Sequence, residues 1–483
     1  MFSKTKEILP YQAVITKIGY ITPIQGADRI VAANISGRTC IVNADCKPDM
    51  IGVLFTPGTQ LSLEYARKNN LFSSSELNSD PAKKGFLAKN RKVTTLTLKG
   101  VCSDGLFMPL ESLVMQTGDL QFLNLEPNTS FFELIDCKGI KHPVCSRYES
   151  YIDKQSFRPK KKLPLLKRIR AAIQNLYAES KWDYGDRFPE HSKTNYFKEN
   201  NHVILDAIKN SNARITITPK LHGTSARYGC VWRTKEPRGL FKWFKKPLGE
   251  YVNIGGSRRV VIGNMSSSGF HGSNSFRNDY LKVLENHLLA GMVVYGEIVG
   301  FANNKSIMAT HDTSIIKNKE FKKKVVDTFG KTITYSYGCS NSHDAKHNKF
   351  YIYRILKTSN GHLVDLSPDE INEFAKPFIK YGVDSVYNYR LVDNLSPEEK
   401  LEKVFDLSNR PDEFTRDYID PSHPNEGVTV RVDVVDAEGK ASCKFYKDKS
   451  FLFMTLEDFS CVRETDEDGL GVPEEQIATD ASE

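Results

Sequence analysis

Residues 8–113 contain short apolar runs that turn-forming residues separate at close intervals. The runs lie at residues 13–15, 29–31, 39–42, 52–55 and 93–98. Turn signals rich in Gly, Asp and Ser lie between several of them, for example at residues 25–28, 36–38 and 57–59. Several short strands at this spacing predict a small closed β-barrel. The OB fold is one such barrel, and it commonly binds nucleic acids.

A different pattern fills residues 171–463, where strand-like runs are mixed with helical segments. The strand-like runs lie at residues 214–218, 291–297, 350–355 and 427–435, and the helical segments at residues 278–289, 368–380 and 397–405. This mixture predicts an α+β fold. The sequence therefore predicts two domains, an OB-fold nucleic-acid-binding domain at residues 1–153 and an α+β domain at residues 171–463.

Charge is unevenly distributed along the chain. The formal net charge is +8, but residues 464–483 hold eight acidic side chains and no Lys or Arg. Without them the chain carries 67 basic and 51 acidic residues, a net charge of +16. Residues 154–170 alone carry eight Lys and Arg and no acid, which predicts a basic linker that leads into a helix. A basic body attracts polyanions, of which nucleic acid is the commonest, whereas the tail at residues 464–483 is expected to be disordered.

Apolar residues and cysteines bear on where the protein works. No stretch of 18 apolar residues is present, and the N-terminus lacks an apolar core of signal-peptide length, so neither a membrane span nor secretion is expected. The nine cysteines are scattered, and none has CxxC spacing. These features predict reduced thiols in a cytoplasmic, reducing compartment and argue against a zinc site.

Lys220 is the first candidate for chemistry. It follows the strand-like run at residues 214–218 and precedes the small residues Gly223, Thr224 and Ser225. A strand end that leads into a glycine turn can hold an amine in place and leave backbone room for a phosphate. A lysine can attack phosphorus once it is deprotonated, but a lysine at a strand end is more often exposed and inert.

Five further segments follow Lys220 in an order that resembles the covalent nucleotidyltransferases, which include ligases and mRNA capping enzymes. Lys220-Leu221-His222-Gly223 resembles their Lys-x-His-Gly nucleophile motif. The other matching segments are Ser257-Arg258-Arg259, residues 294–300 with Glu297, residues 350–355 with Tyr353, residues 426–430 with Glu426, and Cys443-Lys444-Phe445. The resemblance implies that residues 171–463 form a nucleotidyltransferase domain with mixed antiparallel sheets and helices.

The resemblance also implies roles, which fit the chemistry of each residue type. Lys220 would carry AMP, Tyr353 would stack on adenine, and Glu297 would accept hydrogen bonds from the ribose. Arg258 and Lys444 would stabilise the α-phosphate, and Glu426 would hold hydrated Mg²⁺ or Mn²⁺. Accessory roles fall to His222, Ser225, Arg259, Lys447 and Lys449.

Four positions depart from the family pattern, and one of them is Ser225, which stands where some RNA ligases have asparagine. Pro219 stands where relatives often have glutamate, and Arg354 where many have aspartate. Ser442 replaces a lysine that relatives have two residues before the position of Lys444, so Lys447 or Lys449 is a candidate substitute.

Domain order narrows the resemblance. Only 39 residues follow Lys444, too few for the downstream barrel of DNA ligases and capping enzymes. A barrel before the nucleotidyltransferase domain resembles the Deinococcal type of RNA ligase, which implies a monomer that uses ATP to join RNA or RNA-containing duplex ends. The reaction would pass through lysyl-AMP and an adenylylated 5′ end, and removal of residues 1–150 would leave lysyl-AMP formation intact. The alternatives are a guanylyltransferase that caps RNA and a non-catalytic RNA-binding protein with a ligase scaffold.

Overall fold

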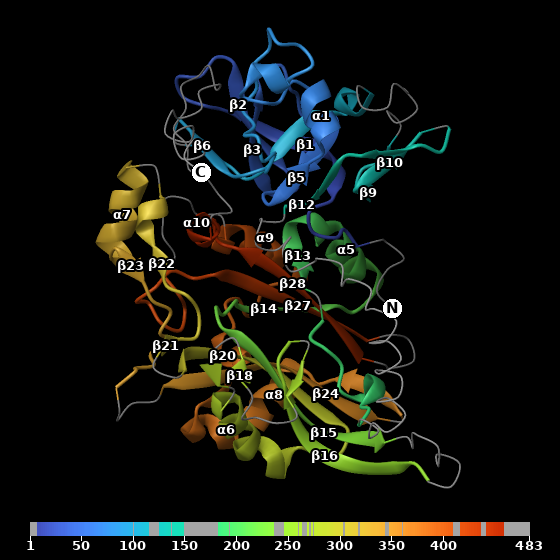
Figure 1. The fold of residues 1–483 in the computed structure, drawn as a ribbon, viewed down its shortest axis with the longest axis vertical. Coiled ribbons are helices and arrows are strands. Elements are labelled where there is room, and N and C mark those ends of the chain that lie inside the picture. The colour runs from blue at the N-terminus through green and yellow to red at the C-terminus, as the bar shows by residue number, and fades with distance from the viewer. Residues whose placement is uncertain are drawn as a thin grey trace, which may run out of the picture.

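The chain forms a β-rich N-terminal module, residues 7–148, and a larger layered body, residues 182–457 (Figure 1). The computed structural model describes residues 7–99, 101–114, 125–136, 138–148, 182–192, 194–235, 246–258, 260–262, 268–269, 272–273, 275–302, 305–316, 319–342, 347–359, 361–408, 416–435 and 441–457. The predicted basic linker at residues 154–170 and the acidic tail at residues 464–483 lie outside the described residues.

A sheet with the order β3-β2-β1-β4-β8, and with β9 beside β1, forms the centre of the module. Its strands are β1 (Ala13–Pro23), β2 (Ile30–Ile35), β3 (Arg38–Asn43), β4 (Ile51–Phe55), β8 (Leu106–Pro109) and β9 (Ser130–Phe131). Side chains of a strand alternate between its faces, so Val53 and Phe55 enter one apolar core while Leu54 enters another. Around this sheet lie α1 (Leu63–Lys68), β5 (Thr59–Leu61), β6 (Leu96–Leu98), β7 (Val101–Ser103), β10 (Glu133–Ile135), β11 (Lys141–Pro143) and β12 (Cys145–Arg147).

The strands expected in the first domain are confirmed, but the closed barrel stays a prediction. Among the described strands, pairing runs from β3 at one edge to β8 at the other, and β5 pairs with β12 in a separate ladder. The turn at Ser36-Gly37 shows how local sequence sets this topology. Both residues have positive φ, 51° and 74°, which suits the tight hairpin between β2 and β3.

Two sheets, each covered on its outer face by helices, make up the body, which confirms the mixed α and β architecture. The first sheet has the order β13-β28-β27-β14, and the second has β17-β16-β15-β20-β24-β25 with β21 and β26 at its sides. The first sheet comprises β13 (Asn195–Tyr196), β14 (Arg214–Pro219), β27 (Gly427–Val435) and β28 (Ala441–Lys449). The second comprises β15 (Thr224–Lys235), β16 (Leu248–Gly256), β17 (Val261–Ile262), β20 (Met292–Ala302), β21 (Lys305–Ser306), β24 (Asn348–Ser359), β25 (His362–Asp365) and β26 (Val383–Ser385).

Helices α5 (Phe197–Asn210) and α9 (Pro397–Ser408) pack on the first sheet, on the side toward the N-terminal module (Figure 1). Helices α6 (Ser275–Leu284) and α8 (Pro368–Ala375) pack on the far side of the second sheet. Ser367 and Glu370 form a capping box at the start of α8, with Pro368 at its first position, so local sequence fixes where this helix begins.

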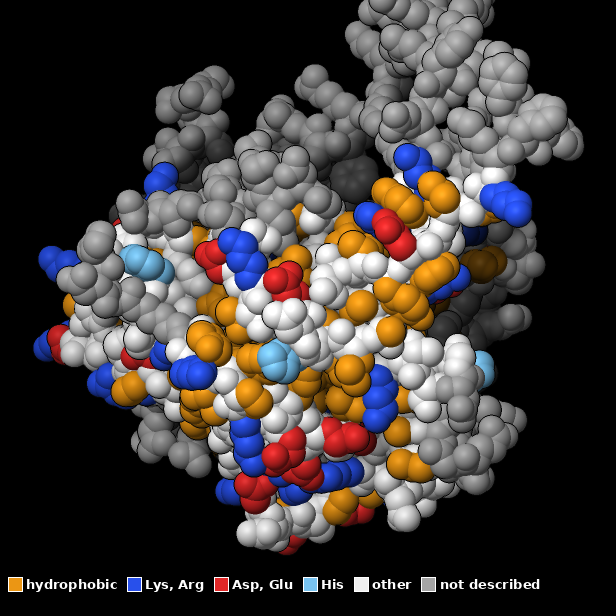
Figure 2. Space-filling view, turned by 90° about the horizontal axis from the view of Figure 1, so that it is seen from below, with side chains coloured by type: hydrophobic (Ala, Val, Ile, Leu, Met, Phe, Trp, Pro, Cys, Tyr) orange, Lys and Arg blue, Asp and Glu red, His pale blue; other side chains and the backbone are white. Residues whose placement is uncertain are grey.

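A smaller apolar cluster closes one side of the body. It joins α7 (Lys319–Phe329), β23 (Thr332–Ile333) and α10 (Phe451–Leu456) to Leu221, next to Lys220. β23 pairs with β22 (His311–Asp312). No helix in the described part of the chain is long and apolar enough to cross a membrane. The underside of the body mixes basic and acidic side chains (Figure 2), so this face does not present the uniformly positive surface that favours a polyanion.

Candidate active site

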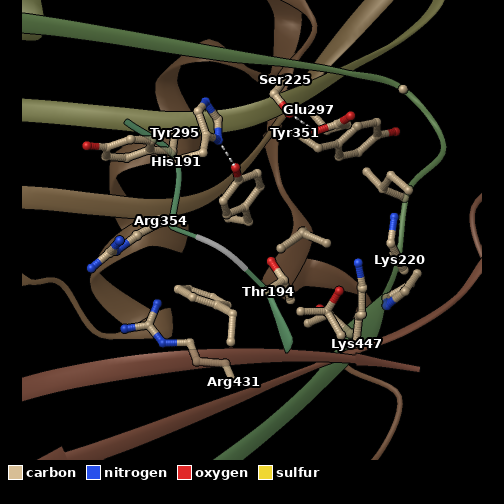
Figure 3. A pocket seen from close by; sticks show the side chains of 18 of the residues that line it. His191, Thr194, Lys220, Ser225, Tyr295, Glu297, Tyr351, Arg354, Arg431 and Lys447 are labelled. Atoms are coloured by element: carbon tan, nitrogen blue, oxygen red, sulfur yellow. Dashed lines mark hydrogen bonds between the residues drawn. The ribbon is translucent and has the colours of Figure 1, made fainter. Parts of the chain in front are cut away.

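A pocket lies between the two sheets of the body, and both sheets line it (Figure 3). The first sheet contributes side chains of β14, β27 and β28, and the second contributes side chains of β15, β20 and β24. Six of the candidate site residues predicted from the sequence line it: Lys220, Ser225, Arg258, Glu297, Tyr353 and Lys447. Residues that lie far apart in the sequence therefore meet at one place.

Lys220 follows β14 directly, and backbone bonds fix its position. Its N–H donates to the carbonyl of Gly427 at 2.9 Å, and the preceding Pro219 pairs with Val428. β14 is the edge strand of its sheet, which explains why a proline without an N–H is tolerated there. The strand end predicted from the sequence is thus confirmed.

The Lys220 side chain meets a buried carboxylate. Its Nζ lies 2.6 Å from Oε1 of Glu426, whose side chain is only 4% exposed. Lys449 Nζ lies 3.7 Å from the same oxygen. Burial alone would raise the pKa of Glu426, but Lys220 and Lys449 outweigh it, so the pKa lies below its ordinary value. Glu426 is therefore a buried carboxylate between two amines.

Gly223 allows the turn after Lys220 to approach the second sheet closely. A Cβ at this position would lie 2.4 Å from the carbonyl oxygen of Ile298 and 2.9 Å from Cγ of Glu297. Only glycine fits without a shift of backbone. The small residue brings the lysine loop directly against the strand that carries Glu297.

His222 packs within this turn against aromatic residues. Its N–H donates to the Tyr337 hydroxyl at 2.7 Å, and its ring stacks on His311 and meets the edge of Tyr335. Burial lowers the pKa of His222 to about 3, although Glu426 opposes the shift. His222 is thus a neutral packing histidine, with its Nδ1 3.8 Å from Oε2 of Glu426.

Glu297 faces the pocket from β20, opposite Ser225 on β15. The two are cross-strand partners, and the Ser225 hydroxyl donates to Oε2 of Glu297 at 3.2 Å. Burial raises the pKa of Glu297 to about 7, although Lys220 opposes the shift. This carboxyl therefore changes charge near neutral pH.

Aromatic side chains line the pocket beside Glu297. Tyr353 and Tyr351 come from β24 and Tyr295 from β20, and the Tyr353 hydroxyl is hydrogen-bonded to Nδ1 of His191. Burial, together with nearby arginines, lowers the pKa of His191 to about 3, so this ring is neutral. His191 was not among the site residues predicted from the sequence.

Lys444 requires a correction, because the structure does not bring it to the pocket. Side chains alternate along β28, so Lys444 and Tyr446 share the outer face while Lys447 lines the pocket. The Lys444 amine instead donates to Glu7 at 2.7 Å. Burial, with the cations Lys220 and Lys449 nearby, lowers the pKa of Lys447 to about 8. The spacing Lys447-x-Lys449 was the signal in the sequence that marked the correct face.

Arginines complete the pocket. Arg258 lines it from the turn after β16, whereas Arg259 lies outside the described residues. Arg354 bonds both oxygens of Asp365, at 2.5 and 3.0 Å, and Arg431 bonds Asp433 at 2.8 Å. Carboxylate partners thus fix Arg354 and Arg431 in the wall of the pocket and explain why an arginine is accommodated at position 354.

Among the comparisons with known proteins, only the search of solved structures found similar chains. No protein family model matches the sequence, and no curated protein matches it either. Among solved structures, a lysine-to-alanine mutant of Naegleria gruberi RNA ligase with ATP and Mn is 15% identical, with a TM-score of 0.49, over 94% of this chain and 99% of that one. The Naegleria gruberi RNA ligase with PPi gives the same identity and TM-score over 92% of this chain and 98% of that one.

Proposed function

We propose that this chain is an ATP-dependent RNA ligase in which Lys220 forms the covalent bond to AMP. One observation carries the proposal. The Lys220 amine, held 2.6 Å from a buried carboxylate, opens into a pocket that also holds Glu297, Lys447 and Tyr353. A nucleophile, phosphate-binding cations, a ribose acceptor and aromatic rings are the parts that nucleotidyl transfer requires.

The first step would transfer AMP to the lysine. The Lys220 nitrogen attacks the α-phosphorus of ATP, a P–N bond forms, and the bond from phosphorus to the pyrophosphate oxygen breaks. The nitrogen must lose a proton, and the Glu426 carboxylate, 2.6 Å away, would accept it. Lys447 and Arg258 would stabilise the charge that develops on the phosphate oxygens.

Binding of the nucleoside would fall to the second sheet. Glu297 would accept hydrogen bonds from ribose hydroxyls, and Ser225 orients it. Tyr353, Tyr351 and Tyr295 supply flat apolar surfaces on which adenine can stack. Positioning of this kind accounts for most of the rate enhancement in phosphoryl transfer.

Magnesium or manganese would be the metal cofactor, and Glu426 is the residue that fits it. Its Oε2 is buried without a hydrogen-bond partner. Among the described residues, no group of three or more His, Cys, Asp or Glu could hold a metal ion. A single available carboxylate oxygen suits Mg²⁺, which retains water and completes its coordination with substrate phosphates. Such an ion would supply positive charge beside the α-phosphate.

The later steps would act on RNA. AMP would pass from Lys220 to a 5′-phosphate, and a 3′-hydroxyl would attack the activated end, form the phosphodiester and release AMP. The β-rich N-terminal module, proposed as an OB domain of the Deinococcal type, would bind the duplex that holds the nick. Sealing of broken RNA is the role that this combination supports.

Incubation of the protein with Mg²⁺ and either α-labelled ATP or α-labelled GTP tests the proposal. We expect covalent label from ATP and none in Lys220→Ala. Label from GTP alone would support the second candidate, a capping guanylyltransferase. Absence of label from both nucleotides would leave a non-catalytic RNA-binding protein and overturn the enzymatic function.

A further inference from the structure

The first residues of the N-terminal module reach the outer face of β28, beside α5. Glu7 accepts hydrogen bonds from Lys444 Nζ at 2.7 Å, from the Tyr446 hydroxyl at 3.0 Å and from Asn195 Nδ2 at 2.9 Å. The next residue, Ile8, forms two hydrogen bonds with the Asn200 side chain on α5. The Ile8 N–H donates to Asn200 Oδ1, and Asn200 Nδ2 donates to the Ile8 carbonyl. The strand that presents Lys447 to the pocket therefore contacts the module on its opposite face.

A buried network of charges connects the module with this strand. Arg38 of β3 lies 2.5 Å from Asp104 and 2.6 Å from Glu199 of α5. Lys198 lies 3.3 Å from Asp104 and 3.6 Å from Asp448, the residue between Lys447 and Lys449. All five side chains are at most 11% exposed.

Burial makes this network sensitive to the loss of any member. Charges withdrawn from water are tolerated when they are paired, and removal of one partner leaves the others uncompensated. Asp104 is the member on which Arg38 of the module and Lys198 of the body converge. It therefore joins the module to Asp448 through a single intermediate side chain.

A second path reaches Lys447 through aromatic rings. Tyr11 of the module meets the edge of Tyr196, with ring centroids 6.5 Å apart and planes at 79°. Lys447 Nζ lies 4.8 Å from the centroid of the Tyr196 ring, within the range of a cation–π contact. The two paths are independent, because one passes through charges and the other through rings.

We infer that the N-terminal module is a working part of the adenylylation site, in which Asp104, Arg38 and Tyr11 are positioning residues that hold the β28 lysines. The effect of these residues on the rate of lysyl-AMP formation rests on the proposed function. The expectation that removal of residues 1–150 leaves lysyl-AMP formation intact is thereby replaced, because the module supplies two of the five charged side chains behind the lysine strand.

The test compares Asp104→Asn with Asp49→Asn in the full chain. Asp49 is a matched control, because it also lies in the module but forms an exposed pair with Lys17, with side chains 76% and 60% exposed. At saturating ATP in a single turnover, we expect the label to form on the order of 10²-fold more slowly in Asp104→Asn and at the wild-type rate in Asp49→Asn.

Amplitude and rate separate positioning from stability. A change that merely unfolds part of the sample lowers the amount of label and leaves its rate constant unchanged, and that outcome would overturn the inference. If Asp104→Asn does not fold, the pair Tyr11→Leu and Tyr11→Phe replaces it. The leucine variant should be slow and the phenylalanine variant, which keeps the ring, should be close to wild type.

Reactivity of the Lys447 amine gives a readout without ATP. Acetylation of nucleotide-free protein, followed by mass spectrometry, should modify Lys447 faster in Asp104→Asn than in wild type or Asp49→Asn. Equal reactivity in all three proteins would contradict positioning. If wild type takes no label from ATP, the proposed function fails, and this measurement still decides whether the module holds the lysine strand.

Discussion

Glu297 gives the pocket a group that titrates near neutral pH. Its pKa is raised from 4.5 to about 7 by burial, so the carboxylate predominates only above that pH. The ionised form accepts hydrogen bonds from ribose hydroxyls better than the protonated form. The affinity for ATP should therefore depend on pH in a range where an ordinary glutamate would stay ionised.

We expect the KM for ATP in lysyl-AMP formation to rise about tenfold as the pH falls from about 8 to about 6, because the ionised fraction of Glu297 falls by about that factor. In Glu297→Gln the KM should be high and lose this dependence. Initial rates across ATP concentrations and pH measure both. Lys447, whose pKa is about 8, is present in both proteins, so the effect of its titration on the KM is the same in both. The same pH dependence in Glu297→Gln would assign it to another group.

At the scale of the elements, the sequence pattern predicted β27 but not its neighbour β28. The apolar run at residues 427–435 predicted β27 with its observed bounds, because its valines alternate into the core. Residues 441–449 were not predicted as a strand, since lysines occupy pocket-facing positions where apolar residues would give the usual signal. The pairing of the two strands, with Thr429 opposite Lys447, shows that Lys447 faces the pocket.

This alternation predicts different outcomes for two lysines of one strand. Lys447→Ala should slow lysyl-AMP formation by about 10²-fold, because it removes a cation from the pocket. Lys444→Ala should retain most of the rate, since its amine faces Glu7 on the opposite side. Single-turnover labelling of the two variants measures the contrast, and thermal melts control for stability. A larger loss of rate in Lys444→Ala would place the phosphate on the other face of β28.

At the scale of the whole molecule, the pattern of apolar residues predicted a β-rich first part and a mixed α and β second part, but not how the two parts contact each other. The order of the motifs identified the lysine, the glutamates and the tyrosine that the two sheets bring together. The contact of Arg38 with Glu199 joins residues 161 positions apart, and no local periodicity reports such a pair. Buried polar contacts between domains depend on their relative placement, which hydrophobic patterning does not encode. The sequence pattern therefore did not predict that the N-terminal module contacts β28.

The net charge of +16 on residues 1–463 leads to a last expectation, about salt. Joining of a nicked RNA duplex requires contacts with many backbone phosphates, and each contact releases counterions when it forms. Joining should therefore fall at least about tenfold between about 50 and 200 mM salt, as measured at subsaturating duplex. Lysyl-AMP formation uses the few phosphates of ATP in a partly enclosed pocket and should fall far less in the same buffers. If both reactions declined in parallel, the salt effect would lie in the adenylylation site, and the excess positive charge of residues 1–463 would have another purpose than binding RNA.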